Sequence, residues 1–86
     1  MDVLVSSRKP AKATAQVRPA AAGTLRVNGL LCAASPPIVG VSYVPETRTF
    51  FVTIPDDQPA GVYFGVIVSD DGKNALGTMS ATVFDP

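Results

Sequence analysis

The side chains in this 86-residue chain that could do chemistry are two pairs of adjacent carboxylates and one thiol. The carboxylate pairs are Asp56-Asp57 and Asp70-Asp71, and the thiol belongs to Cys32. Paired carboxylates can serve as general acid and base, or they can bind Ca2+. Because Asp is also a favoured turn residue and both pairs lie between apolar stretches, we interpret them as turn formers.

The rest of the composition argues against catalysis. Histidine, the commonest general base and transition-metal ligand, does not occur in the sequence. A reactive thiol needs a cationic or basic neighbour, and the segment LLCAA around Cys32 offers none. The Ser and Thr residues have no visible activating base. We therefore predict that the protein is not an enzyme, that it holds no cofactor or metal ion, and that Cys32 is buried and unreactive.

A lone cysteine has no disulfide partner within the chain, which fits a reducing compartment or a bacterial source. The first residues, MDVLVSSRKP, show no charged segment followed by an apolar signal region, so we expect no secretory signal and favour the cytoplasm. Every apolar run is shorter than the roughly 20 residues of a membrane-spanning helix, so we expect no membrane span.

The apolar content and the distribution of charge along the chain favour a protein whose surface contacts other molecules. The chain is 47% apolar and only 16% charged, which favours a surface that is partly hidden in an assembly. Residues 1–26 hold five basic residues against one acidic residue, whereas residues 27–86 hold two basic residues against six acidic ones. This polarity can orient neighbouring subunits, bring a basic arm to an acidic surface, or be satisfied within the chain itself.

Alternation of apolar and polar residues predicts six or seven short strands and no helix. The strands are expected at 2–6, 23–33, 38–44, 48–54, 61–69 and 77–83, with an additional edge strand at 13–17. Turn signals recur about every 8–12 residues, which predicts a small antiparallel β-sandwich, with a small β-barrel as the alternative. Residues 1–86 then form a single domain, in which the segment 7–22, rich in Pro, Ala and Lys, is an arm or an edge segment.

The segment TIPDDQPAGVYFG, residues 53–65, places Gly61 two positions before Tyr63. This segment resembles the corner of immunoglobulin-like and fibronectin type III domains, in which a strand Tyr bonds through its hydroxyl to backbone just upstream. The resemblance covers mainly residues 53–83 and concerns architecture. It implies an immunoglobulin-like β-sandwich with Gly61 and Tyr63 as structural corner residues, and it carries over no catalytic residue.

The strand 61–69 is apolar on both sides. If Tyr63, Gly65 and Ile67 face the core, the alternate residues face away from it, as does Phe51 of the preceding strand. Contiguous apolar patches of this kind usually mark an interaction surface. We therefore predict a partner-binding surface on one outer sheet face, made by Phe51, Val62, Phe64, Val66 and Val68. The alternative is that the N-terminal arm or a closed barrel covers this face.

These observations predict a non-catalytic structural or accessory module that works by protein–protein contact, as a subunit of a homo-oligomer or of a larger assembly. One alternative is a β protein that binds a small apolar ligand between its sheets or in a barrel mouth. A second alternative is nucleic-acid contact through the basic N-terminal arm, which the absence of interleaved aromatic residues disfavours.

Overall fold

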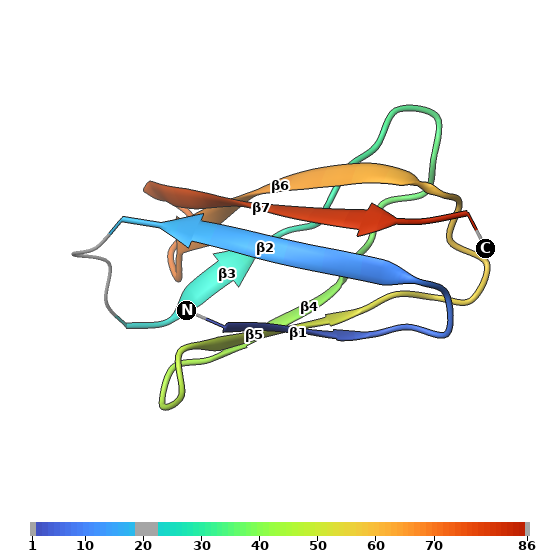
Figure 1. Ribbon diagram of the computed structural model, residues 1–86. Helices are drawn as coiled ribbons and strands as arrows, with labels where there is room; N and C mark the ends of the chain where they lie inside the picture. Colours follow the sequence, from blue (N-terminus) through green and yellow to red (C-terminus); the bar gives the residue numbers. More distant parts are fainter. Residues whose placement is uncertain (1, 19–22, 86) are drawn as a thin grey trace.

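A computed structural model describes residues 2–18 and 23–85 of the chain, and within these ranges all regular structure is β. Seven strands form two sheets that pack face to face, as Figure 1 shows. The three-stranded sheet has the order β1 (Asp2–Ser6), β5 (Thr49–Thr53), β4 (Gly40–Val44). The four-stranded sheet has the order β2 (Ala11–Val17), β7 (Ala75–Val83), β6 (Gly61–Ser69), β3 (Leu25–Val27). The predicted all-β class and number of strands are confirmed.

One strand pair departs from the predicted antiparallel arrangement. β1 runs parallel to β5, with Asp2 opposite Thr49 and Ser6 opposite Thr53. The two strands are far apart in the sequence, so no tight hairpin forces them into opposite directions. The other pairs are antiparallel. No helix in the described part of the chain has the length and apolar character needed to cross a membrane.

The predicted strand at 23–33 is interrupted. β3 ends at Val27, and Gly29 then adopts a φ of +156°. Beyond Gly29, Leu30 forms a bridge with Ile38 and is buried, whereas Leu31 forms a bridge with Phe64 and is exposed. The alternation of buried and exposed residues therefore shifts by one residue at Gly29, and Leu31 does not share the inward face of β3.

The segment predicted as an arm or edge segment, 7–22, contains a regular strand. Its residues 11–17 form β2, which pairs with β7 along its whole length and forms the edge of the four-stranded sheet. Residues 19–22 lie outside the described residues. Because β2 extends the sheet sideways, it does not cover the sheet's outer face.

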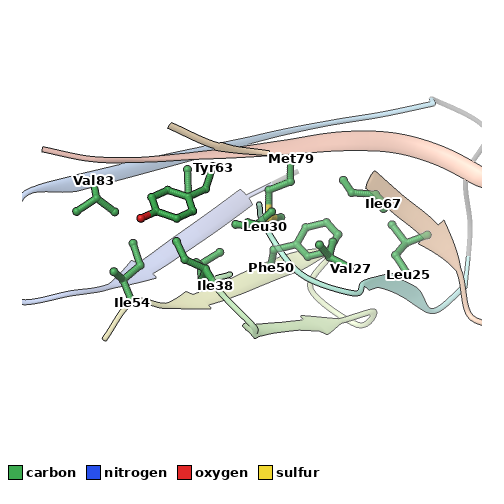
Figure 2. Packing of buried hydrophobic residues seen from close by; sticks show 12 residues of the cluster. Leu25, Val27, Leu30, Ile38, Phe50, Ile54, Tyr63, Ile67, Met79 and Val83 are labelled. Carbon is green, nitrogen blue, oxygen red and sulfur yellow. The ribbon is translucent and has the colours of Figure 1, made fainter. Parts of the chain in front are cut away.

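The core lies between the two sheets and draws on both of them, as Figure 2 shows. Tyr63 and Ile67 reach into it from β6, and Phe50 reaches into it from β5, where its ring lies 4.6 Å from that of Tyr43, centre to centre. Each large side chain that is fully buried contributes roughly 1.5–3 kcal/mol. The buried apolar residues are Leu25, Val27, Leu30, Ile38, Phe50, Val52, Ile54, Tyr63, Ile67, Met79, Ala81 and Val83.

A hydrogen bond anchors the corner that leads into β6. The hydroxyl of the buried Tyr63 donates to the carbonyl oxygen of Pro59 at 2.6 Å, as expected for a strand Tyr at such a corner. Gly61 has a φ of +155°, and a Cβ at this position would lie 3.1 Å from the Cys32 sulfur. A second bond, from the Gln58 side-chain amide to the carbonyl oxygen of Pro36 at 2.6 Å, ties the corner to the neighbouring loop. The corner thus fixes where β6 begins.

Replacing Tyr63 by Phe should lower the free energy of unfolding by about 1–2 kcal/mol, because the Pro59 carbonyl loses its donor. The matched control is Tyr43→Phe, whose half-buried ring also packs on the core and which should change stability by about 0.5 kcal/mol or less. Urea unfolding of the three proteins measures both effects. Equal stability of Tyr63→Phe and wild type would show that the corner does not depend on this bond.

Candidate interaction surface

Four apolar side chains gather on the outer face of the four-stranded sheet. Val62, Phe64 and Val66 alternate along β6 and are 44%, 61% and 51% exposed. Leu31 is 64% exposed and lies opposite Phe64, with which it exchanges two backbone hydrogen bonds of 2.7 and 2.9 Å. Directly opposed residues of antiparallel strands bring their side chains into contact range. These four residues, Leu31, Val62, Phe64 and Val66, are called the β6 patch below.

Polar side chains border the β6 patch on one side. Thr78, Ser80 and Thr82 of β7 lie opposite Val66, Phe64 and Val62. Beyond them, β2 presents its exposed residues, including Thr14, whose hydroxyl lies 3.2 Å from that of Ser80. The outer face therefore changes from apolar at β6, through hydroxyl groups at β7, to polar at the edge strand.

Two hollows lie beside the patch. One of about 180 Å3 lies between Phe64 and Thr14. The other, of about 530 Å3, is lined by Val66, Arg18 and the start of β7. Both open onto the same face as the β6 patch, so this face is uneven and offers recesses for the side chains of a partner.

The structure brings together only part of the predicted partner-binding set. Val62, Phe64 and Val66 share the outer face of the four-stranded sheet, but Phe51 does not. Phe51 lies on β5, opposite Leu4 on the outer face of the three-stranded sheet, where the two are 39% and 54% exposed. The outer faces of the two sheets point away from each other. The prediction of one common surface is therefore wrong for Phe51, because the chain changes sheets between β5 and β6.

Val68 lies at the margin of the surface. It is half-buried, and the β6–β7 register shifts between Ile67 and Val68, so that Val68 lies opposite Ala75. On its other side it lies opposite Arg26 of β3. Leu31, which was not in the predicted set, belongs to the surface beside Phe64, whereas Phe51 lies on the other sheet and Val68 at the margin. The signal for Leu31 is Gly29, because a break in alternation there turns the second Leu of the LL pair outward.

The acidic pair in the β6–β7 turn forms local hydrogen bonds. The Asp71 carboxylate accepts hydrogen bonds from the Ser69 hydroxyl and from the Lys73 backbone N–H, and Gly72 adopts a φ of +76° in the turn. The bond from Ser69 and then the bond from Lys73 hold the pKa of Asp71 below its ordinary value of 3.8. The interpretation of Asp71 as a turn residue is confirmed.

The other candidate chemical groups are dispersed. Asp56 faces Arg8 at 3.7 Å in an exposed ion pair, a type worth at most about 1 kcal/mol. Cys32 is half-buried, so the expectation of full burial is wrong in degree. In residues 2–18 and 23–85, no three His, Cys, Asp or Glu residues gather closely enough to hold a metal ion.

Basic residues near the start of the chain contact the protein's own surface. Besides the pair between Arg8 and Asp56, the Lys9 ammonium donates to the carbonyl oxygen of Gln58 at 2.8 Å. The Lys12 ammonium lies 5.9 Å from the centre of the Phe84 ring. Part of the positive charge of this segment is thus engaged within the chain.

No protein-family model matches this chain, and neither the curated proteins nor the solved structures contain a significant match. The assignment of a role therefore rests on the geometry of the molecule.

Replacing Ser69 by Ala should raise the pKa of Asp71 toward 3.8, because the carboxylate loses its hydroxyl donor. Since the folded-state pKa is lowered, the turn's contribution to stability is present above pH 3.8 and is lost as the pH falls through the folded pKa. An NMR titration of the Asp71 carboxyl carbon measures the shift, with Ser80→Ala as a remote control. An unchanged titration in Ser69→Ala would contradict the assigned cause.

Proposed function

We propose that this chain is a non-catalytic structural or accessory module that binds another protein through the β6 patch. The main support for this proposal is that four apolar side chains are exposed together on one sheet face, namely Leu31, Val62, Phe64 and Val66. At about 25 cal/mol per Å2 of apolar area, covering four half-exposed side chains of this size would contribute several kcal/mol. A contiguous apolar patch is the usual mark of a protein contact.

The arrangement around the patch also supports a protein contact. Phe64, an aromatic anchor, lies in the middle of the row between Val62 and Val66, and the hydroxyl groups of β7 form a polar border. An apolar centre with an aromatic anchor and a polar rim is the usual anatomy of a protein interface. Because β6 is hydrogen-bonded on both sides, to β7 and to β3 with Leu31, the patch is held on a rigid scaffold. Binding therefore costs little conformational entropy.

A small apolar ligand has less support. The hollow between the sheets, lined by Leu25, Val41 and Phe50 among others, measures about 210 Å3. Ligand pockets commonly measure about 300–1,000 Å3. The larger hollows lie beside β2 and the start of β7 and at the ends of β1 and β5, where they suit the side chains of a partner better than an enclosed ligand.

The proposal includes an immunoglobulin-like architecture and a role without catalysis. The bond from Tyr63 to Pro59 supports the first part, because it matches the corner found in those domains. The lack of histidine in the sequence supports the second part. The bonds that hold the Asp71 carboxylate in the turn support it as well. Nucleic-acid contact through the basic segment is less favoured, since Arg8 and Lys9 already contact groups of the chain itself.

Phe64→Ser should change the free energy of unfolding by less than about 1 kcal/mol, because the ring is 61% exposed. The matched comparison is Phe50→Ala, which removes a fully buried ring and should cost about 3–5 kcal/mol. Urea unfolding of both variants measures the difference. A loss in Phe64→Ser as large as that in Phe50→Ala would place the ring in the chain's own core and contradict the proposal.

Partner binding is tested with a photo-crosslinking phenylalanine analogue at position 64, expressed in the cells of origin. We expect one dominant crosslinked protein, which is lost when Val62→Ser and Val66→Ser are added. The control carries the analogue at position 39, where Val39 is 69% exposed in a loop. Identical crosslinks from both positions, or none from position 64, would refute a specific contact at the β6 patch.

A further inference from the structure

The edge strand β2 has an open side. It pairs with β7 on one side only, in a continuous register from Ala11 opposite Val83 to Val17 opposite Gly77. No other strand among residues 2–18 and 23–85 pairs with its second side. A row of unpaired N–H and C=O groups on such an edge is a template for pairing with another strand.

The hydrogen bonds to β7 identify the residues that face the open side. The Arg18 N–H donates to the Leu76 carbonyl at 2.9 Å, and the Phe84 N–H donates to the Pro10 carbonyl at 2.9 Å. In an antiparallel pair the N–H and C=O of one residue point to the same side, and successive residues alternate. The even-numbered residues of β2 therefore bond to β7. The odd-numbered residues, Ala11, Ala13, Ala15 and Val17, direct their backbone groups to the open edge.

β2 lacks most of the devices that normally block an edge. Exposed edges are blunted by short length, bulges, prolines, inward-pointing charges or charged side chains on the edge, especially Lys. The edge strands β3, β4 and β1 have three, five and five residues, whereas β2 has seven, with no bulge and no proline within it. Its inward side chains are apolar, and its one charged residue, Lys12, lies on the outer face. This makes β2 the longest open edge in the described part of the chain.

We propose that two copies of this chain associate through their β2 edges, antiparallel and about a two-fold axis at Thr14. The two four-stranded sheets then form one continuous eight-stranded sheet. Ala11 of one copy lies opposite Val17 of the other, and Ala13 lies opposite Ala15. These are the residues whose backbone groups face the edge, so each of these pairs can exchange two hydrogen bonds. Thr14 meets Thr14 of the second copy at the axis.

Charge and length select this register among the possible ones. With Thr14 at the axis, Lys12 lies opposite Gln16, and all seven residues of β2 are paired. Placing Lys12 at the axis sets two ammonium groups opposite each other, and placing Ala15 there sets Lys12 opposite Arg18. Like charges directly opposite are destabilising. Placing Ala13 at the axis avoids this contact but shortens the paired region to five residues.

The apolar side chains beneath β2 favour a second copy. Ala11, Ala13, Ala15 and Val17 point toward the core but remain half-buried, because the sheet ends at this strand. Val3 of β1, which also packs on the core, is likewise half-buried. A second β2 continues the sheet over this row and covers it from water. The pairing therefore adds apolar burial to the backbone hydrogen bonds.

The remaining charges predict a distinctive salt dependence. The Lys12 residues of the two copies lie about 13 Å apart along the strands at about 3.3 Å per residue, beyond the Debye length of about 8 Å at physiological salt. Arg18, however, lies diagonally to Lys12 of the second copy, at about 7–8 Å. Added salt should therefore strengthen the association. An acidic strand of another protein at the same edge would bind more weakly as salt increases.

This contact is separate from the β6 patch. The two-fold axis is perpendicular to the sheet, so both β6 patches lie on the same side of the eight-stranded sheet and remain open. The dimer would then present two copies of the patch to a partner. The gain in affinity from two patches on one dimer rests on the proposed function, whereas the edge pairing itself does not.

The test uses charge at Thr14, which is exposed and lies at the proposed axis. In sedimentation experiments, wild type should form a dimer at high concentration, and added salt should increase the fraction of dimer. Thr14→Lys should weaken dimerisation by about threefold to tenfold, because it places like charges together at the axis and diagonally to Lys12 of the second copy. A one-to-one mixture of Thr14→Lys with Thr14→Glu should recover a heterodimer, and Gln16→Glu should tighten dimerisation by adding a partner for Lys12. Thermal unfolding monitors the fold of each variant.

Two further measurements separate the outcomes. Hydrogen exchange of the Ala13 and Ala15 amides should slow as the concentration of wild type rises. Phe64→Ser should leave the dimer mass unchanged, so a failure of the β6 patch would not be mistaken for a failure of the edge. A wild type that stays monomeric throughout its soluble range, or a Thr14→Lys variant that dimerises as wild type does, would overturn the proposal. Association weakened by salt would do so as well.

Discussion

The burial of Tyr63 and Ile67 between the two sheets determines the orientation of β6, and with it the character of the molecule's surface. Both side chains are fully buried, and the hydroxyl of Tyr63 is also bonded to Pro59. Because side chains alternate along a strand, Val62, Phe64 and Val66 must then point outward. A slip of one residue would expose Tyr63 and Ile67 and bury the patch instead, so register and surface are fixed together.

Much of the fold can be predicted from the sequence, because period-two alternation is strong in the long strands. The bounds of 2–6 and 61–69 and the inward residues Phe50, Val52 and Ile54 follow from it. Two features do not. The alternation does not show that the chain crosses to the other sheet between β5 and β6, which separates Phe51 from Phe64. It also does not show that β1 pairs in parallel with a strand far along the chain. Both depend on contacts between distant segments.

The candidate site was predictable in its centre and less so at its margins. Val62, Phe64 and Val66 follow from the two-sided apolar pattern of β6. The exposure of Leu31 depends on the break in alternation at Gly29, whose φ is positive, and the partial burial of Val68 depends on the register shift beside it. The sequence predicts β2 only in part, as an edge strand at 13–17 within an arm or edge segment, because Ala and Lys have low strand propensity. Pairing with β7 overrides that weak local preference.

The β6 patch faces water in the free protein. The most direct measurement is NMR line broadening by a soluble paramagnetic agent in a dilute sample. We expect strong broadening of the methyl signals of Leu31, Val62 and Val66, and we expect those of Ile38 and Ile67 to be protected. Protection of the patch methyls to the same degree as the core methyls would contradict this expectation.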